Sequence, residues 1–376
     1  NNLRLGVFDK DSKSIYYFEK KIINDLENQN IEKLLNTLIR DAEKNLSTHI
    51  DSVVVLYDSP EFYSLDISIK KVFDHPTSIK QVYSNLIKEA HFIISQNNFK
   101  DRIIHLMVNN ILVDKHKSLD IITDDIKIKS LILEIKFICL NKILVNNISN
   151  QFKKNNLQIS NLYCSSYVKA FSFKKNLSVK DYFIFLDIGF ERASSIIINN
   201  SKFEFFKSIP LGGNNITKDI SKVLNLDLGY SEDLKIKFNK TEKDKLFSKS
   251  DMNEINPYSE ILEKNISIDL LKQIIEARID EIIELVVLRS NHNKNSKLFE
   301  KPKLVIFGGG SKLLSNNYKL RINKLVSEVI IFDENDSSIC AAGLNYDKSD
   351  ESFVIKTKKK IKKLGFFEKF FNLFAK

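Results

Sequence analysis

The chain has 376 residues, which at roughly 100–200 residues per domain is long enough for two or more compact units. Hydrophobic residues make up 43% and charged residues 28% of it, a mixture that excludes a wholly disordered chain and a polytopic membrane protein. The three cysteines are widely spaced, so they give neither a disulfide framework nor a CxxC zinc motif, and they favour a reducing compartment.

The net charge of +10 is concentrated at the carboxyl end. Residues 356–376 carry eight lysines and one glutamate, and therefore seven of the ten net positive charges. Because the rest of the chain is nearly balanced, we do not expect the basic face of a nucleic-acid-binding protein. A basic tail that lies beside an anionic surface is the better interpretation.

In the first half, apolar spacing and turn residues predict alternating strands and helices. The predicted strands are Leu3–Phe8, Ser14–Phe18, Asp51–Tyr57, Arg102–Val113, Ile126–Cys139 and Leu157–Leu162. The predicted helices are Ile31–Asn45, Ser78–Ser95, Leu140–Lys154 and Ser165–Phe173. We expect Asp51–Tyr57 to be buried, because it is short and rich in β-branched residues.

In the second half, the predicted strands are Tyr182–Ile188, Ser194–Asn199, Phe203–Ile209 and Leu304–Phe307. The predicted helices are Ile216–Leu224, Ile268–Arg289 and Asp336–Tyr346. Residues 239–257 are polar and are expected to form an internal loop, and Ser290–Lys301 and Lys348–Lys360 are expected to be linkers. The chain thus predicts an α/β fold.

Glycine is rare, with 10 residues where an average of about 7% predicts more than twice as many. Three glycine motifs follow predicted strands: Asp187-Ile188-Gly189, Gly212-Gly213-Asn214 and Gly308-Gly309-Gly310. Glycines at a strand end expose backbone N–H groups and let the chain approach a phosphate or a sugar closely. An ordinary turn is the alternative for each motif, and it is the simpler interpretation of the first one.

The order and spacing of these motifs resemble the actin-like ATPase superfamily, and within it the bacterial cell-division protein family FtsA. The segments that carry the resemblance are Asp101–His105, Lys202–Ile220, Ser231–Lys235, Ile274–Ile283, Leu304–Gly310 and Ser337–Tyr346. The resemblance implies two α/β lobes around a nucleotide cleft. It divides the chain into a first lobe (1–60 and 159–180), an inserted subdomain (61–158), a second lobe (181–347), a basic linker (348–360) and an amphipathic helix (361–376).

The resemblance also implies a nucleotide site and a cellular role. The implied contacts to ATP are Asp187, Gly189, Gly212, Gly213, Asn214, Lys235, Gly308, Gly309 and Gly310, with Mg²⁺ left open and its ligands unassigned. The implied role is polymerisation and tethering of the tubulin-like protein FtsZ to the inner face of the bacterial cytoplasmic membrane at the division septum. Further implied partners are other membrane proteins of the division machinery.

Two departures from the family pattern argue against efficient hydrolysis. The first strand and phosphate loop of the family are absent from this chain, since Leu3–Phe8 resembles the strand that follows them. The second phosphate motif, D-x-G-G-G-T in the family, continues here as Phe190-Glu191-Arg192. An aromatic ring and a carboxylate at these positions oppose a phosphate, and Arg192 compensates only in part. We therefore assign no catalytic residue and expect at most a very weak ATPase.

The carboxyl-terminal segment predicts an interfacial membrane helix. Its apolar and basic residues are Lys362, Lys363, Leu364, Phe366, Phe367, Phe370, Phe371 and Phe374. On a helical wheel the apolar residues occupy about half of the circle, as in helices that insert into the headgroup region of anionic membranes. The alternative is a terminal helix that docks on the protein itself or on another subunit.

Two other functions remain open. One is an actin-like adaptor of pilus assembly that resembles PilM and binds a peptide of a membrane protein; such a protein would lack the phenylalanine-rich tail. The other is a phosphotransferase of the sugar-kinase or chaperone-ATPase kind, which would need both phosphate loops. His105 is interpreted as a structural strand residue, and the cysteines as small buried hydrophobic residues.

Overall fold

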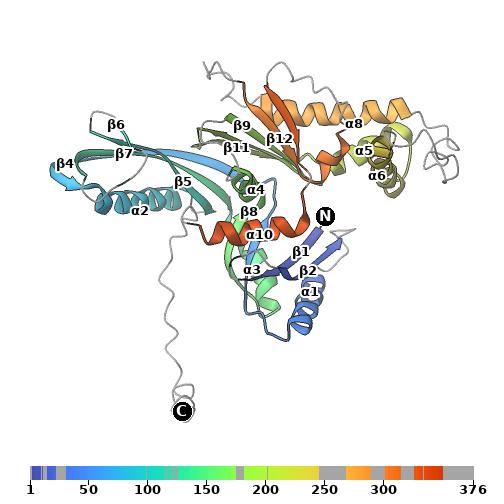
Figure 1. Ribbon diagram of the computed structural model, residues 1–376, viewed down its shortest axis with the longest axis horizontal. Helices are drawn as coiled ribbons and strands as arrows, with labels where there is room; N and C mark the ends of the chain where they lie inside the picture. The colour runs from blue at the N-terminus through green and yellow to red at the C-terminus, as the bar shows by residue number, and fades with distance from the viewer. Residues whose placement is uncertain are drawn as a thin grey trace, which may run out of the picture.

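The computed structural model describes residues 2–9, 11, 15–22, 31–98, 100–114, 117–119, 122, 126–174, 182–200, 202–244, 268–288, 301–314, 326–332 and 334–349. The predicted amphipathic helix, and most of both predicted linkers, lie outside these residues. Within them the strands form four sheets (Figure 1). None of the described helices combines the length and the apolar character needed to cross a membrane.

The largest sheet belongs to the second half of the chain. It contains β9 (Tyr182–Ile188), β10 (Ala193–Asn199), β11 (Lys202–Ile209), β12 (Lys303–Phe307) and β13 (Glu328–Ile331). The strand order is β11-β10-β9-β12-β13, with β9 parallel to β12 and antiparallel to β10. The sequence predicted four of these strands and missed β13. Because β9 and β12 are adjacent and parallel, the loops that follow them emerge at the same edge of the sheet.

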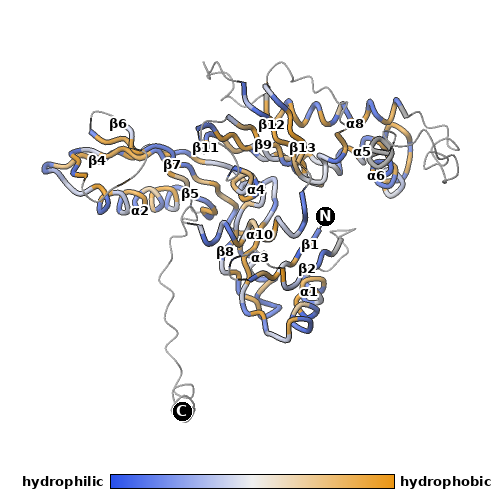
Figure 2. Tube along the Cα trace, in the orientation of Figure 1, coloured by the Kyte–Doolittle hydropathy of each residue, from blue (hydrophilic) through white to orange (hydrophobic). Residues whose placement is uncertain are grey.

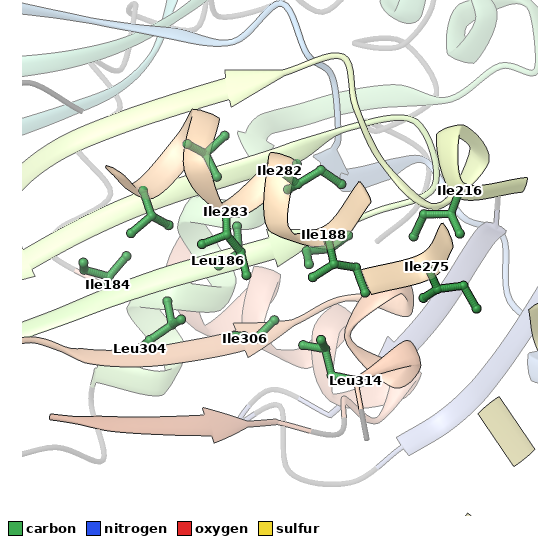
Figure 3. Packing of buried hydrophobic residues seen from close by; sticks show 14 of the residues in the cluster. Ile184, Leu186, Ile188, Ile216, Ile275, Ile282, Ile283, Leu304, Ile306 and Leu314 are labelled. Atoms are coloured by element: carbon green, nitrogen blue, oxygen red, sulfur yellow. The ribbon is translucent and has the colours of Figure 1, made fainter. Parts of the chain in front are cut away.

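Alternate residues of the central strands enter two different cores. Ile184, Leu186 and Ile188 of β9 pack with the helices on one face (Figure 3), whereas Phe183 and Phe185 point to the other face. The helices of the second half are α5 (Gly213–Leu224), α6 (Leu228–Asp244) and α8 (Ile268–Ile283), which continues into the π-helical turn η1 (Glu284–Leu288). Apolar and polar residues alternate along α8 in Figure 2, as expected for a helix with one buried face.

The structure corrects two predicted boundaries in this region and adds one helix. α5 begins at Gly213 rather than Ile216, because the turn after β9 supplies the carbonyl oxygens that accept from the N–H groups of Gly213 and Asn214. α6 was not predicted, and it extends to Asp244, so residues 239–244 are helical and not part of a loop. Residues 245–257 lie outside the described residues. The polar sequence provides no clear signal for α6, because the apolar residues buried in its described part are only Leu234 and Phe238, beside the buried polar residues Ser231 and Lys235.

In the first half, the predicted hairpin is confirmed as β1 (Asn2–Phe8) and β2 (Ile15–Ile22), which are antiparallel. A separate pair of parallel strands consists of β3 (Ser52–Tyr57) and β8 (Gln158–Cys164). The helices here are α1 (Ile31–Leu46), α3 (Lys142–Lys154), α4 (Ser165–Lys174) and α10 (Asp336–Asp347). The expectation that β3 is buried was wrong: its residues are half-buried or exposed.

The remaining sheet has the strand order β4-β7-β5-β6 and carries α2 (Ile79–Asn97) on one face (Figure 1). Its strands are β4 (Tyr63–Ser78), β5 (Asp101–Val113), β6 (Lys117–Ser118) and β7 (Lys127–Asn141). β4 and β6 were not predicted, and Leu140 and Asn141 belong to β7 rather than to the helix that follows. This sheet contacts β11 through a hydrogen bond from Ser64 Oγ to the carbonyl oxygen of Phe206 (3.2 Å).

His105 has the structural role that the sequence indicated. It is buried in β5, where its Nε2 accepts a hydrogen bond from the backbone N–H of Cys164 (2.9 Å) and its Nδ1 lies 3.0 Å from the hydroxyl of Tyr346. Because Nε2 is the acceptor, the proton lies on Nδ1 and the ring is neutral. Burial accordingly lowers the pKa of His105 to about 3.

Cys139 and Cys164 are also buried, as expected, and Cys340 is half-buried.

Candidate functional site

The candidate site lies where β9 and β12 end side by side. Asp187 of β9 is opposite Phe307 of β12, so the loops that begin at Gly189 and Gly308 are neighbours. Gly308 has φ +92°, a conformation that disfavours any residue with a side chain. A Cβ atom at Gly308 would also lie 2.5 Å from Asp187 Oδ1. The first glycine of the triplet is therefore required by the fold, whether or not a ligand binds.

Asp187 is completely buried and is surrounded by hydrogen-bond donors. Its Oδ2 accepts from Ser166 Oγ (2.9 Å) and from Arg192 Nη2 (2.6 Å). Lys169 Nζ lies 3.2 Å from the same oxygen. The guanidinium of Arg192 also bonds to the carboxylate of Asp58 and to Ser194 Oγ (3.2 Å). The carboxylate that the sequence assigned to contact with ATP is thus the centre of an internal ion-pair network.

The protonation of this network follows from its geometry. Burial by itself raises the pKa of Asp187, but Arg192 and Lys169 outweigh this effect and hold it at about 2. For Arg192, burial lowers the pKa, whereas Asp187 and Asp58 raise it well above its usual range. Asp187 and Arg192 are therefore both charged at neutral pH, and each stabilises the charged form of the other.

Lys169 links Asp187 to the glycine triplet. Its Nζ lies 3.1 Å from Glu334 Oε1, and Glu334 Oε2 accepts a hydrogen bond from the backbone N–H of Gly308 (3.1 Å). Burial raises the pKa of Glu334, an effect that Lys169 opposes. The N–H group of Gly308, which the sequence assigned to contact with ATP, therefore donates to a carboxylate of the protein.

The Gly212-Gly213 motif is also engaged within the protein. The N–H of Gly213 donates to the carbonyl oxygen of Gly189 (2.9 Å), and that of Asn214 donates to the carbonyl oxygen of Phe190 (2.7 Å). A Cβ at Gly212 would lie 2.6 Å from both of these oxygens. The motif thus lets the amino end of α5 contact the turn after β9, and the N–H groups of Gly213 and Asn214 are used in that contact.

Lys235 of α6 lies against the same turn. Its Nζ donates to the carbonyl oxygen of Gly213 (3.0 Å), to Thr217 Oγ1 (2.7 Å) and to Glu232 Oε2 (2.6 Å). It also lies 5.7 Å from the centre of the Phe190 ring, a cation–π contact. Burial lowers the pKa of Lys235, and Glu232 opposes this effect.

Gly309 differs from the other glycines of the site. It is exposed, and a Cβ built on it meets no other atom within 4 Å. By contrast, a Cβ at Gly310 would lie 2.3 Å from Ile188 Cγ2. Packing therefore requires glycine at positions 308 and 310 of the triplet but not at Gly309, which faces solvent.

The structure brings the predicted site residues together, and it adds partners that the sequence did not indicate. Asp58, Ser166, Lys169 and Glu334 come from three separate segments, since Ser166 and Lys169 both lie on α4, and no motif marked them. Arg192 had been noted only as a departure from the family pattern. Within the described residues, no cluster of three or more His, Cys, Asp or Glu side chains is arranged to hold a metal ion.

Comparison with known proteins supports the resemblance found in the sequence. A family model described as "Cell division protein FtsA" matches residues 184–339, a span that contains every residue assigned to nucleotide contact. The chain is related to FtsA. It is 23% identical over 328 residues to FtsA of Buchnera aphidicola subsp. Baizongia pistaciae, covering 85% of this chain and 74% of that protein. It is 29% identical over 136 residues to FtsA of Buchnera aphidicola subsp. Acyrthosiphon pisum, covering 34% and 32%.

A solved structure confirms the fold over most of the chain. The structure described as "PilM-PilN type IV pilus biogenesis complex" superimposes with a TM-score of 0.54 and covers 92% of both chains. The sequence identity is 14%, so the similarity concerns the fold alone. The predicted actin-like α/β fold is thereby confirmed.

Proposed function

We propose that this protein is a cell-division scaffold of the FtsA type, which acts through binding and assembly rather than through nucleotide turnover. The FtsA family match supports the role in division. The buried network of Asp187, Arg192 and Lys169 supports the absence of efficient hydrolysis, because it neutralises internally the carboxylate that would face a metal and a γ-phosphate. Assembly of the protein into polymers and attachment of FtsZ are part of the proposal.

Only part of the candidate site suits a nucleotide. The N–H groups of Gly213 and Asn214 donate to carbonyl oxygens of the turn after β9, and the N–H group of Gly308 donates to Glu334. These three N–H groups already have partners within the protein and are not available to a phosphate. The exposed backbone at Gly309 is open and suits a sugar or an adenine ring. We therefore propose contact with the nucleoside end of ATP at Gly309, with Lys235 holding the neighbouring turn. Phosphoryl transfer needs a metal and donors aligned on the γ-phosphate.

We predict that the protein binds ATP weakly and hydrolyses it almost not at all. Calorimetric titration should give similar affinities for ATP and adenosine, because the phosphates add few contacts. A phosphate-release assay should give a rate far below the about 1–100 per second of kinases. Turnover in that range would contradict the proposal and favour the phosphotransferase alternative.

The variant Gly309→Val tests the location of the nucleotide. It should abolish ATP binding while leaving the melting temperature unchanged, because the new side chain enters open space. The melting temperature is therefore the control that separates a lost contact from a damaged fold. Full ATP binding by a folded Gly309→Val protein would show that the triplet serves only as a turn.

The second part of the proposal is that the chain attaches to the cytoplasmic membrane through residues 361–376. We predict that deletion of residues 356–376 moves the protein from anionic vesicles into the supernatant in a sedimentation assay, because this segment holds seven of the ten net charges and the five phenylalanines. Added salt should weaken binding by screening the lysines, which contribute roughly 1 kcal/mol each near the surface.

Point variants of the full chain separate the apolar contribution to vesicle binding from the electrostatic contribution. Phe367→Asp combined with Phe371→Asp should release the protein, because both side chains lie on the apolar side of the helical wheel. Asn372→Asp, on the polar side, is the control and should retain most of the binding. Sedimentation of the truncated protein with vesicles would contradict the anchor.

The PilM-like adaptor remains the second proposal because of the fold similarity over 92% of both chains. The neighbour's description names a complex of PilM with PilN, which suggests binding of another protein by this fold. A pull-down with purified FtsZ distinguishes the division scaffold from the adaptor. Binding of FtsZ supports the division scaffold, and absence of binding by the folded full-length chain favours the adaptor.

A further inference from the structure

Two carboxylates that belong to none of the glycine motifs lie at the carboxyl ends of β9 and β12. Asp58 follows β3 in the first half of the chain, and its partner Arg192 follows β9 in the second half. Glu334 lies between β13 and α10 and contacts Gly308, which follows β12. Both carboxylates therefore reach the candidate site through the tertiary structure.

Asp58 and Glu334 bind three donors of different kinds. Asp58 pairs with the guanidinium of Arg192. Glu334 Oε1 lies 3.1 Å from Lys169 Nζ, and Glu334 Oε2 accepts from the backbone N–H of Gly308 (3.1 Å). A guanidinium, an ammonium group and a glycine N–H at a strand end are groups that proteins use to bind phosphate oxygens. The chain thus has donors suited to a phosphate, and its own carboxylates occupy them.

Asp187 shows that the three donors converge on one place. Its Oδ2 lies 2.6 Å from Arg192 Nη2 and 3.2 Å from Lys169 Nζ. Gly308 lies against its other oxygen, since a Cβ built on Gly308 would be 2.5 Å from Asp187 Oδ1. The three donors therefore surround one buried carboxylate, and one polyphosphate chain is long enough to contact them together.

The charges of the network leave no cation free for an added anion. Arg192 and Lys169 contact three carboxylates, those of Asp58, Asp187 and Glu334. The side chains of both cations are largely buried, with exposed fractions of 5% and 11%, so solvent screens these interactions weakly. A phosphate that approached either cation would have to displace one carboxylate and would be repelled by the others.

Asp58 is the outermost member of the network. Its side chain is 44% exposed, whereas that of its partner Arg192 is 5% exposed. Gly309, next to the Gly308 N–H group, also faces solvent. Loss of the Asp58 carboxylate would therefore make Arg192 accessible from the solvent side while the buried pair of Arg192 and Asp187 stays in place.

We propose that Asp58 and Glu334 are internal ligands of these phosphate-type donors and exclude the phosphates of a nucleotide from the site. Both carboxylates are part of the chain, so they compete with a free anion at a high effective concentration. The pair of Asp58 and Arg192 also joins the two halves of the chain without a nucleotide. The inference extends the proposed function, because it explains why a nucleotide would be held by its nucleoside end alone.

Inorganic triphosphate is the probe, because it carries the oxygens and charge of the nucleotide phosphates without a nucleoside. In the full chain, Asp58→Asn combined with Glu334→Ala removes both internal ligands. Calorimetric titration should show triphosphate binding about tenfold tighter or more than in the unmodified chain, because the freed donors form charge-assisted hydrogen bonds with phosphate oxygens. Triphosphate should also raise the melting temperature of the double variant more than that of the unmodified chain.

The matched control is Asp219→Asn combined with Glu281→Ala, which removes the two carboxylates that pair with Arg278 on α8. It changes the net charge by the same amount and keeps the lysine-rich residues 356–376, so it measures non-specific attraction of triphosphate. It should bind triphosphate as the unmodified chain does. Asp58→Asn alone, at a half-exposed position, should keep the fold and give a smaller gain in affinity than the double variant.

Adenosine separates this inference from the proposed nucleoside contact. Its affinity should be the same in the unmodified chain and in the double variant, because Gly309 is unchanged. Tighter triphosphate binding without any adenosine binding would support the exclusion of phosphates and contradict only the nucleoside contact. The exclusion is overturned if folded Asp58→Asn and the double variant bind triphosphate no more tightly than the unmodified chain, or if the control gains as much affinity as the double variant.

Discussion

Replacing Arg192 with methionine is expected to lower the free energy of unfolding by about 3–5 kcal/mol, the usual loss when one partner of a buried ion pair is removed. Arg192 and Asp187 are both buried, and their charged groups are 2.6 Å apart. Methionine fills much of the same volume but leaves the carboxylate of Asp187 with one cation, Lys169, at 3.2 Å. Urea unfolding of the two proteins measures the difference.

The control for this prediction is Arg278→Met. Arg278 also pairs with carboxylates, those of Asp219 and Glu281, but its side chain is 22% exposed. Its replacement should cost about 1 kcal/mol or less, because solvent screens such pairs. Combining Arg192→Met with Asp187→Asn should recover part of the lost stability, since the buried charge is then removed. A similar loss in Arg192→Met and Arg278→Met would contradict a special role for the buried network.

The pH dependence gives a second measure of the same interaction. In the protein, the pKa of Asp187 is about 2, below the model-peptide value of 3.8. Its ion pairs therefore stabilise the fold above pH values near 4, and this contribution is lost as the pH falls from about 4 towards 2. Arg192→Met removes the more strongly acting of the two cations that lower the pKa of Asp187. The stability difference between the two proteins should thus narrow as the pH falls through this window.

Replacing Gly212 with alanine is the other substitution with a large expected effect, a loss of about 3 kcal/mol or more. The added Cβ would lie 2.6 Å from the carbonyl oxygens of Gly189 and Phe190 and 2.8 Å from the backbone nitrogen of Arg192. All three atoms belong to the backbone, so none can rotate away. Relief would require the turn after β9 to separate from α5, breaking the hydrogen bonds of Gly213 and Asn214.

Gly309→Ala is the matched control, because its Cβ meets no atom within 4 Å. It should change the free energy of unfolding by no more than about 0.5 kcal/mol. The two substitutions are chemically identical, so the comparison isolates the contact of the added methyl group. Equal effects of Gly212→Ala and Gly309→Ala in chemical denaturation would show that the close approach of α5 to the turn does not exist in solution.

Local sequence patterns determined the elements with strong periodicity or clear turn residues. Such patterns predicted several elements correctly, namely the hairpin β1-β2, the strands β9 to β12 and the helices α1, α2 and α10. The rarity of glycine also marked the correct loops, because Gly212 and Gly308 lie where a side chain would collide with backbone or with Asp187. Apolar periodicity and the positions of glycines are features of short segments, so they can be read from one sequence.

Only the tertiary structure decided how these glycines and charges are used. The N–H groups of Gly213, Asn214 and Gly308 donate to groups of the protein. Asp187 finds partners on α4, and Arg192 finds one in the segment before β4. Pairing between distant segments leaves no spacing pattern in the sequence. The half-buried state of β3 has the same origin: its residues specify a central strand, but burial depends on a neighbouring strand on each edge, and the described chain provides one.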